Sequence, residues 1–330
     1  MYVVTGGAGF IGSNLVAALE KSGRHKIAIC DRFGSDEKWR NVAKRALTEI
    51  IAPETLLTYI EDNANRIEAI FHMGAISATT ETDVDLIIQN NFRLSCDIWK
   101  ICCIRKLPLI YASSAATYGD GSGGFADDFN PDCLSKLQPL NAYGWSKHLF
   151  DRWISSLLQD SGISSAPPQW AGLKFFNVYG PNEYHKGTMI SVALKNFLEI
   201  KAGGPAVLFR SHKPGIDHGN QMRDFIWVGD CVKVMLWLLN HSGTNGIFNL
   251  GTGKAQSFLE LANAVFRAMG LKSEIRFVDT PTSIRDKYQY FTQADIRKLR
   301  AAGYNEPFVD VKIGVQKYVQ KFLLSEDPYR

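Results

Sequence analysis

The 330-residue sequence lacks the residue spacings that mark metal sites and disulfide-linked proteins. No two of its six cysteines stand in CxxC spacing, and none of its seven histidines belongs to an HExxH pattern. Such spacings hold structural zinc, catalytic zinc or redox-active disulfides. Several cysteines lie in apolar stretches, where a free thiol packs as a small hydrophobe. We therefore expect a metal-free protein with reduced cysteines.

An excess of one charge and long apolar runs are also missing. The chain has 37 Lys and Arg residues against 33 Asp and Glu, a formal net charge of +4, and the basic residues are scattered. This pattern disfavours nucleic acid and membrane surfaces as partners. The most apolar predicted helix, 232–239, is too short to span a membrane, and Met1 leads directly into an apolar segment without a secretory signal. We expect a cytoplasmic protein.

The clearest positive signal is a glycine-rich turn at the start of the chain. A short apolar strand at 2–4 precedes it, and apolar residues with helical spacing follow it. Gly6 lets the backbone bend, Gly9 lets a pyrophosphate approach the main chain, and Gly12 lets helix and strand pack closely. Phosphates would bind at the helix N-terminus, where N–H groups and the helix dipole favour negative charge. The alternative is a glycine-rich turn that binds nothing.

A second apolar strand, 27–30, is followed by Asp31 and favours the interpretation that the glycine turn binds phosphates. A Rossmann unit places an acid on the adenosine ribose at this interval, so strand, turn, helix and acid together predict a dinucleotide site. Arg32 and Lys38 follow, and a cation there can hold a 2′-phosphate. Asp31 favours NAD whereas the two cations favour NADP, so we expect NADP, with NAD as the alternative. The rest of the polar segment 32–45 is typical of a solvated loop.

Apolar strands alternate with predicted helices over about the first 175 residues. One strand at 69–73 ends in Gly74 and Ala75, and another at 109–114 ends in polar residues. This alternation predicts an α/β fold with a Rossmann-type doubly wound parallel sheet, which binds ligands at the carboxyl ends of its strands. A single helix is expected over 83–103. His72, at the end of its strand, is expected to be a packed core histidine.

The residues Tyr143 and Lys147 indicate chemistry beside that site. Positions four apart on a helix share a face, so the phenol and the ammonium point the same way. The positive charge favours the phenolate and predicts a Tyr143 pKa lowered from about 10. Ser114, at the tip of its strand, can hydrogen-bond the same substrate oxygen. A YxxxK pair is common by chance, and its position downstream of a dinucleotide site gives it weight.

Six different short motifs are spread along almost the whole chain, at residues 6–12, 111–119, 143–147, 175–181, 223–230 and 248–253. Together they resemble the extended short-chain dehydrogenase/reductase family, which includes nucleotide-sugar epimerases and dehydratases. The resemblance implies that Ser114, Tyr143 and Lys147 form a catalytic trio. It also implies a smaller, discontinuous α/β domain that binds the substrate.

Three further stretches, 182–189, 288–295 and 299–304, resemble the branch of this family that acts on ADP-heptoses. That branch inverts C6″ of ADP-D-glycero-β-D-manno-heptose for the lipopolysaccharide core. The resemblance implies an ADP-sugar substrate, tightly bound NADP that oxidises C6″ to a ketone, and a homo-oligomer, a pentamer. Reduction from the opposite face needs a proton donor on each side, so Lys186 is implied as the second catalytic group. The alternative for Lys186 is a solvated charge or a phosphate contact.

The resemblance extends to residues around both ligands. Those implied to bind the cofactor are Gly6, Gly9, Phe10, Ile11, Gly12, Asp31, Arg32, Lys38, Met73, Gly74, Ala75, Ile76, Ser77, Asn90, Lys147, Val178 and Lys186. Those implied to bind the substrate are Ser114, Asn177, Thr188, Lys195, Phe209, Arg210, Ser211, His212, Arg223 and Tyr288. The fork of donors on Arg223 suits a diphosphate. Its alternative is a structural ion pair with Asp224 or another acid.

The order of the motifs predicts two discontinuous domains. The NADP-binding domain is expected to comprise 1–175, 225–250 and 288–304. The substrate-binding domain is expected to comprise 176–224, 251–287 and 305–330. The closing helix, 309–324, has an apolar stripe that indicates core packing.

Three features depart from the family pattern. Met73 stands where an acid is expected, Lys174 stands where an arginine is expected, and the segment 211–222 is longer than usual.

Competing functions are a UDP-hexose 4-epimerase, a 4,6-dehydratase and a catalytically silent NADP-binding regulator. Ala115 follows Ser114 where a dehydratase usually has an acid nearby, which disfavours that activity. The intact trio disfavours the regulator, because binding alone does not require it.

Overall fold

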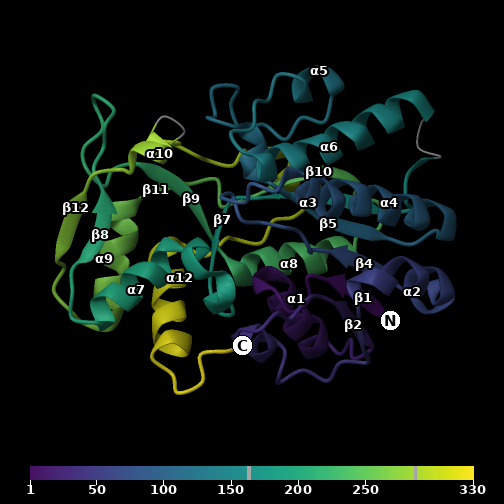
Figure 1. Cartoon of the computed structure of the whole chain (residues 1–330), viewed down its shortest axis with the longest axis horizontal. Coiled ribbons are helices and arrows are strands. Elements are labelled where there is room, and N and C mark those ends of the chain that lie inside the picture. Colours follow the sequence, from purple (N-terminus) through teal and green to yellow (C-terminus); the bar gives the residue numbers. More distant parts are fainter. Residues whose placement is uncertain (162–164, 286–287) are drawn as a thin grey trace.

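The computed structural model describes residues 1–161, 165–285 and 288–330, which form a large lobe and a smaller one (Figure 1). The large lobe is built on a seven-stranded parallel sheet in the order β10-β6-β5-β4-β1-β2-β3. This is the predicted Rossmann-type arrangement. The strands are β1 (Tyr2–Thr5), β2 (Ile27–Cys30), β3 (Glu49–Ile51), β4 (Ala69–His72), β5 (Leu109–Ser114), β6 (Trp170–Phe175) and β10 (Gly246–Leu250).

Helices cover both faces of this sheet, which explains why its strands are apolar throughout. On one face lie α1 (Phe10–Lys21) and α8 (Val228–Leu239), which pack on each other and on the strands. On the other face lie α2 (Leu56–Asp62), α4 (Leu94–Arg105) and α6 (Ala142–Ser161), around a core centred on Trp99 and Phe150.

The sheet order reverses its direction of growth between β1 and β4. Strands β2 and β3 extend the sheet on one side of this point, and β5, β6 and β10 extend it on the other. The carboxyl ends of β1 and β4 therefore lie at the point where open α/β sheets bind dinucleotides. Their backbones nearly touch there, since a Cβ on Gly6 would lie 2.7 Å from the Gly74 Cα. Gly6 also has a positive φ of 63°, which favours glycine.

The segment expected to form one helix over 83–103 is instead interrupted. It consists of α3 (Val84–Ile87), a π-helical turn at Ile88–Arg93, and α4. The π-helical turn carries Asn91, whose side chain donates to the Ile76 carbonyl (2.9 Å) and accepts from the Ile76 N–H (2.8 Å). Such turns often occur at functional sites because they redirect a side chain.

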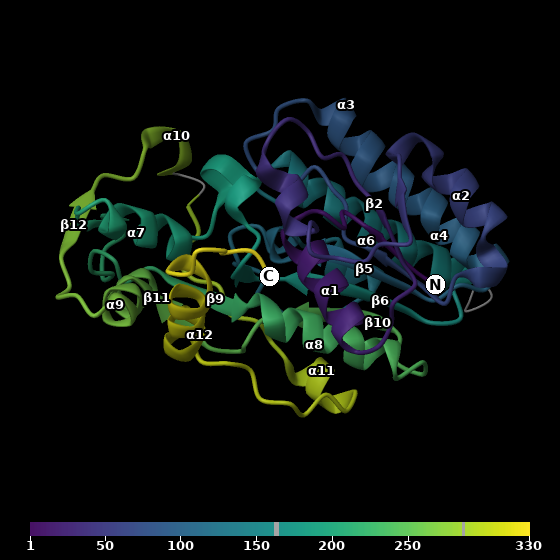
Figure 2. The same cartoon turned by 90° about the horizontal axis from the view of Figure 1, so that it is seen from below.

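The smaller lobe begins where β6 ends and lies beside the large sheet in both views (Figure 2). It contains a three-stranded sheet, β11-β9-β7, and a parallel pair, β12 and β8. The strands are β7 (Asn177–Tyr179), β8 (Ala206–Phe209), β9 (Met222–Trp227), β11 (Ala255–Ser257) and β12 (Ile275–Val278). The longer helices of this lobe are α7 (Val192–Lys201), α9 (Phe258–Met269) and α12 (Val311–Tyr318). Three short helices of the chain are α5 (Pro131–Leu134), α10 (Thr282–Arg285) and α11 (Arg297–Ala301).

The closing helix packs as its apolar stripe indicated. Val311, Val315 and Tyr318 of α12 are buried in the core of the smaller lobe, against α9. A π-helical turn at Val319–Leu323 follows α12. The expected domain division remains a prediction: β10 joins the large sheet, whereas β9, part of which was expected with it, pairs with β7 and β11. Residues 286–287, at the expected end of one segment, lie outside the described residues.

Among the described helices, none combines the length and the apolar character needed to cross a membrane.

The glycine turn gives a direct test of the fold. In Gly12→Ala the new Cβ would overlap the carbonyl oxygen of Gly6, so α1 must move away from the turn. We expect a loss of about 1–3 kcal/mol in the free energy of unfolding, as for other overpacked sites. Dinucleotide affinity should fall by more than tenfold, because the helix N-terminus moves with the turn. Urea unfolding and fluorescence titration with NADPH measure the two effects.

The matched control is Gly243→Ala, because a Cβ at Gly243 meets nothing within 4 Å. This variant should unfold and bind dinucleotide as the wild type does. A Gly12→Ala protein with unchanged stability and affinity would contradict the packing argument.

Candidate active site

The glycine turn places the start of α1 at the carboxyl end of β1, where the strand order of the sheet reverses. The Gly9 N–H donates to the Gly6 carbonyl oxygen (3.0 Å), and Gly9 immediately precedes α1. Because Gly9 has no side chain to cap the helix, the first N–H groups of α1 are available for phosphate. Ile11, Met73 and Val178, all expected at the cofactor, pack against the same core cluster.

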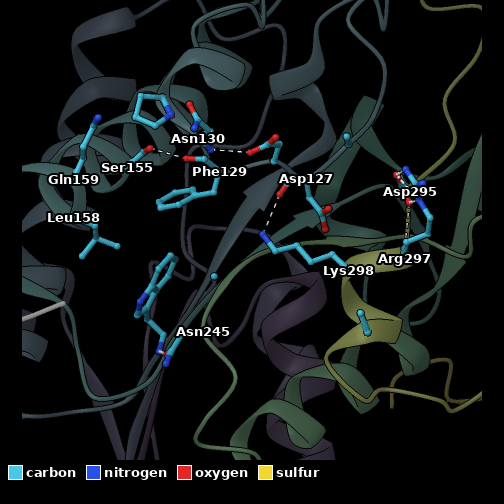
Figure 3. Close-up of a pocket in the computed structure, with 16 residues that line it drawn as sticks. Asp127, Phe129, Asn130, Ser155, Leu158, Gln159, Asn245, Asp295, Arg297 and Lys298 are labelled. Carbon is cyan, nitrogen blue, oxygen red and sulfur yellow. Dashed lines mark hydrogen bonds and ion pairs between the residues drawn. The ribbon is translucent and has the colours of Figure 1, made fainter. Parts of the chain in front are cut away.

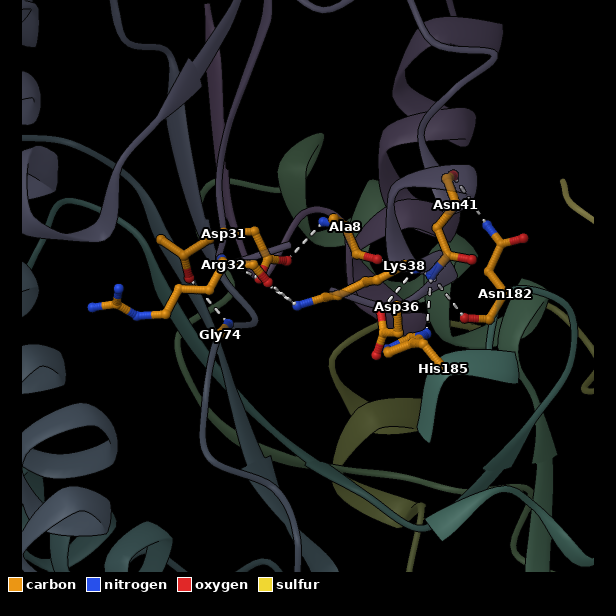
Figure 4. Close-up of polar contacts among 10 residues, drawn as sticks. Ala8, Asp31, Arg32, Asp36, Lys38, Asn41, Gly74, Asn182 and His185 are labelled. Atoms are coloured by element: carbon orange, nitrogen blue, oxygen red, sulfur yellow. Dashed lines mark hydrogen bonds and ion pairs between the residues drawn. The ribbon is translucent and has the colours of Figure 1, made fainter. Parts of the chain in front are cut away.

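Asp31 is held beside this turn by the Ala8 N–H, the Lys38 ammonium and the N–H of the following residue, Arg32 (2.8 Å) (Figure 4). One carboxylate oxygen accepts from the Ala8 N–H (2.9 Å), and the other accepts from the Lys38 ammonium (2.6 Å). The Asp31 side chain is 8% exposed and that of Lys38 is 18% exposed. Arg32 reaches away to an exposed ion pair with Glu54 (2.5 Å). The expected ribose acid and one expected cation are therefore together, whereas the second cation lies at the surface.

Asn41 is a functional candidate that the sequence pattern did not indicate. It is buried, although the segment 32–45 was expected to be mostly solvated. Its amide donates to the carbonyl oxygens of Ala8 (2.8 Å) and Asn182 (3.1 Å), and it contacts His185 Nδ1 (3.1 Å) (Figure 4). Asn41 thus joins the glycine turn to the loop that leads to Lys186.

The segment from Met73 to Ser77 is fixed from both ends. At β1, the Thr5 hydroxyl accepts from the Gly74 N–H (3.0 Å) and is bonded to His72 Nδ1 (2.7 Å). Burial lowers the pKa of His72 to about 3, so it is a neutral core histidine, as expected. At the other end Asn91 holds Ile76, whereas Asn90, expected at the cofactor, donates to the Leu86 carbonyl oxygen (2.8 Å).

The three residues predicted to be catalytic, Ser114, Tyr143 and Lys147, lie where β5 ends and α6 begins. Asn141 caps the start of α6 by accepting from the Gly144 N–H (2.8 Å). A Cβ at Gly144 would lie 2.7 Å from the Ala116 carbonyl oxygen, so the first turn of α6 packs directly on the loop after Ser114. This contact brings Tyr143 to Ser114, with which it shares a hydrogen bond.

The pKa of Tyr143 corrects one expectation. Burial raises its pKa above the ordinary value, and the hydrogen bond with Ser114 lowers it by less. The expected lowering by Lys147 is not found, because removal of the phenolate from water outweighs the favourable contacts. Lys147 is itself buried, which lowers its pKa to about 8, while the negative charge of Asp151 one turn later acts in the opposite direction.

Lys186 lies beside Phe10, the first residue of α1. It belongs to the short 3-10 segment Tyr184–Met189, and its ammonium is 5.3 Å from the centre of the Phe10 ring. Burial lowers its pKa, and the charge of the neighbouring Glu183 raises it. Glu183 is fully buried and accepts from the hydroxyl of Ser191 (2.7 Å). The structure thus places Lys186 with the expected cofactor residues, and its catalytic role remains a prediction.

Four of the expected substrate residues form a connected group in the smaller lobe. The Lys195 ammonium is 5.8 Å from the Phe209 ring centre, and that ring meets Tyr288 edge-on at 6.2 Å. The Arg223 guanidinium is 5.3 Å from the Tyr288 ring centre. This set of cations and aromatic faces suits a nucleoside diphosphate.

Arg223 does not make the structural ion pair that was its alternative. Its nitrogens donate to the carbonyl oxygens of Met222 (2.9 Å) and Gln289, and among the described residues it has no acidic partner. Asp224 instead accepts from the Thr252 N–H and hydroxyl (both 2.7 Å). The positive charge of Arg223 is therefore buried without a carboxylate.

The remaining expected substrate residues are more dispersed. Arg210 makes an exposed ion pair with Asp279 (3.4 Å), and Ser211 donates to the Lys213 carbonyl oxygen (3.1 Å). His212 donates its N–H to the Tyr290 hydroxyl (3.0 Å) and accepts from the Thr280 N–H (3.2 Å), so the long segment 211–222 contacts both residues. Asn177 and Thr188 are exposed, near the boundary between the lobes.

The structure also has a cavity of about 920 Å³ at the sheet edge formed by β10 (Figure 3). Phe129, Trp170 and Asp295 line it, and Lys298 donates to the Asp127 carbonyl oxygen (3.1 Å) at its side. None of the expected site residues lines this cavity. Within the described ranges, no group of three or more His, Cys, Asp or Glu side chains could hold a metal ion.

Comparisons with known proteins identify the family of the chain. A sequence model of the NAD-dependent epimerase/dehydratase family matches residues 2–251. The chain is similar to two proteins named ADP-L-glycero-D-manno-heptose-6-epimerase, each matched over 100% of both chains. One, from Nitratidesulfovibrio vulgaris, is 46% identical over 331 residues, and the other, from Fusobacterium nucleatum, is 43% identical over 337 residues.

A solved structure gives the same answer at the level of the fold. The crystal structure of ADP-L-glycero-D-manno-heptose-6-epimerase from Helicobacter pylori superposes with a TM-score of 0.77 at 26% identity. The match covers 97% of this chain and 95% of that one. Its extent, the family match and the dinucleotide turn lead to one conclusion: the chain belongs to the NAD-dependent epimerase/dehydratase family.

Proposed function

We propose that this protein is an epimerase that inverts C6″ of ADP-D-glycero-β-D-manno-heptose to give the L-glycero epimer. The observation that carries the proposal is that Tyr143 lies beside Ser114 at the carboxyl end of β5, with Lys147 one helical turn later on α6 and close to His72 at the end of β4. The family match and the full-length relatives of that name support the same substrate. The product would serve the lipopolysaccharide core, and we propose a cytoplasmic homo-oligomer, a pentamer, as the working form.

The residues of the trio have distinct roles in this reaction. A nicotinamide cofactor, when bound, would supply the hydride acceptor and donor that oxidation and reduction at C6″ require. Tyr143 takes the proton of the C6″ hydroxyl as the ketone forms, and Ser114 orients the same oxygen by a hydrogen bond. The Lys147 ammonium can hold the ribose of the cofactor and, with cofactor and substrate bound, would favour the tyrosinate, an effect that the protein alone does not show. Because burial raises the pKa of Tyr143 in the protein alone, a further positive charge at the site would favour its deprotonation.

Inversion requires the ketone to turn so that its opposite face receives the hydride. The oxygen then lies on the other side, away from Tyr143, and needs a second proton donor. Lys186 lies beside the cofactor residues, and burial lowers its pKa, which favours proton transfer near neutral pH. We propose Lys186 for this role. The cations and aromatic rings around Arg223 and Tyr288 would bind the ADP moiety.

We further propose NADP as the preferred cofactor. The carboxylate of Asp31 is occupied by the Ala8 N–H and by Lys38, so it is less available to a free 2′-hydroxyl. A 2′-phosphate could instead bind Lys38, with Arg32 free to turn from its exposed ion pair.

Replacement of Tyr143 tests the proposed chemistry. Tyr143→Phe removes the proton acceptor and leaves the ring, so turnover should fall about 10²–10⁴-fold while NADP affinity stays unchanged. Proton NMR of the purified protein with ADP-D-glycero-D-manno-heptose would follow the epimer, with UDP-galactose tested in parallel. Tyr59→Phe serves as the control. The Tyr59 hydroxyl contacts the Met1 sulfur, which precedes β1, whereas Tyr143 lies at the carboxyl end of β5.

Each other result has a clear meaning. Full activity of Tyr143→Phe would remove that residue from the mechanism. Conversion of UDP-galactose but not the heptose would move the substrate assignment to the 4-epimerases. If neither sugar reacts with NADP supplied, the epimerase proposal fails and a silent binding protein is favoured.

Cofactor preference has its own test. Lys38→Ala should weaken NADP binding about 10–100-fold, because one charge-assisted contact is worth about 1.5–3 kcal/mol. NAD binding should change little or improve, because Asp31 becomes free to accept from a ribose hydroxyl. Isothermal titration with both dinucleotides gives the ratio, and Lys100→Ala, an exposed lysine of α4 paired with Asp97, is the control. A wild type that binds NAD more tightly than NADP would contradict the preference.

A further inference from the structure

A buried ion pair lies directly behind the catalytic trio. The Lys174 ammonium on β6 donates to the Asp151 carboxylate on α6 at 2.8 Å, and both side chains are fully buried. Asp151 stands one helical turn after Lys147 on the same face of α6. Lys174 stands opposite Ser113 in the parallel register of β6 and β5, which places Phe175 opposite Ser114. The pair thus spans the helix and the two strands that carry the trio.

The hydrogen bonds of this pair hold the chain on both sides of Ser114. Before it, the Ser113 hydroxyl donates to Asp151 (2.7 Å). After it, Thr117 accepts from the Lys174 ammonium (2.7 Å) and donates to the Ser114 carbonyl oxygen (2.8 Å). The backbone that carries Ser114 is therefore anchored from two directions.

Aromatic side chains complete the surroundings of the pair. The Tyr111 hydroxyl donates to Asp151 (3.3 Å), and Tyr111 lies over Gly172 so closely that a Cβ there would overlap its ring. The Lys174 ammonium is 4.9 Å from the centre of the Tyr118 ring. Both charges therefore have polar partners or an aromatic face, and neither is left uncompensated in the core.

Stability alone does not account for such a pair. Two charges removed from water lose their hydration, and the replacement of a buried pair by neutral residues of similar size is often harmless or stabilising. What this pair provides beyond stability is a fixed geometry between α6, β5 and the loop after Ser114.

We propose that Asp151 and Lys174 are positioning residues for the reaction, which fix Ser114 against Tyr143 and keep the Lys147 ammonium charged. This inference rests on the proposed epimerase function. The effect on Lys147 follows from the charges that face it. His72, from β4, is uncharged because burial lowers its pKa to about 3. Asp151 is the nearby negative charge that raises the Lys147 pKa, against the burial that lowers it to about 8.

Other titratable groups also lie around Asp151. Burial lowers the pKa of His148 to about 4, so this neighbour on α6 is neutral at working pH. Lys174 is the cation bonded to Asp151, and Arg152 acts on His148. Loss of the Asp151 charge would therefore leave Lys147 with burial alone, and its ammonium would lose its proton at a lower pH.

The double variant Asp151→Asn/Lys174→Gln removes both charges and keeps donors and acceptors at both positions. We expect its kcat to fall about 10–100-fold, with KM and the NADP dissociation constant within about twofold of wild type. The alkaline limb of the kcat–pH profile should move to lower pH. Lys174→Arg keeps the ion pair and should retain kcat within about threefold. Thermal unfolding of each variant tests that the fold persists.

A matched control separates position from burial. Asp230→Asn also removes a buried carboxylate that is bonded to a lysine, Lys233 (3.1 Å), but it lies on α8, across the sheet from α6. It should leave kcat and its pH profile unchanged. Wild-type kcat and an unmoved profile in the double variant would overturn the positioning role. So would a loss of kcat that merely follows the fraction of unfolded protein.

A second measurement does not depend on the substrate. The side-chain ¹⁵N resonance of Lys147, assigned by its loss in Lys147→Gln, can be titrated in wild type and in the double variant. A lower midpoint in the double variant supports the inference, and equal midpoints overturn it. A wild type that fails to epimerise the heptose would contradict the proposed function, whereas the titration would still decide the role of the pair.

Discussion

The close approach of the Gly6 and Gly74 backbones is the contact on which the rest of the site depends. It joins the carboxyl ends of β1 and β4, where the strand order of the sheet reverses. A side chain at Gly6 would overlap the backbone of Gly74, so the glycine turn and the start of the segment from Met73 to Ser77 pack directly on each other. The N-terminus of α1 follows directly after the same turn, and Asp31 accepts a hydrogen bond from the Ala8 N–H within it.

A series of buried hydrogen bonds extends from this contact to α6. His72 links Thr5 of β1 to Ser95 of α4 (3.0 Å). The Ser95 hydroxyl donates to the Asn91 carbonyl oxygen (2.6 Å), and the Asn91 amide donates to Ser146 (3.0 Å) on α6.

Ser146 in turn donates to the carbonyl oxygen of Tyr143 (2.7 Å). The residue expected to exchange a proton with the substrate is therefore fixed through polar contacts to the turn expected to hold the cofactor. A second buried network, around Asp151 and Lys174, fixes Ser114 from the opposite side. Such fully bonded networks restrict motion, because any displacement would leave a polar group without a partner.

The local parts of this account could be predicted from the sequence. The turn from Gly6 to Gly12, the acid at Asp31 and the pair Tyr143 and Lys147 depend on short spacings within one strand, turn or helix. The apolar runs of the strands were sufficient to predict the doubly wound sheet, because helices cover both of its faces.

What could not be predicted depends on contacts between distant segments. The helical phase that turns Asn91 rather than Asn90 toward Ile76 depends on a π-helical turn, which no spacing indicates. The direction of the Tyr143 pKa depends on how fully the folded chain removes its hydroxyl from water.

The partners of buried charges belong to the same class. Lys174 could be recognised as unusual, but its pairing with Asp151 joins a strand to a helix and is visible only in the fold. In the same way, Arg223 was equally compatible with an ion pair until the structure placed its donors on carbonyl oxygens.

The central claim is that C6″ is inverted by removal and return of the same hydride. The most direct test is turnover of ADP-D-glycero-D-manno-heptose by the purified protein in D₂O, followed by proton NMR and mass spectrometry of the product. The account predicts an L-glycero product that keeps protium at C6″, because the hydride never exchanges with solvent. Deuterium at C6″ of the product would show inversion by proton exchange and would contradict the account.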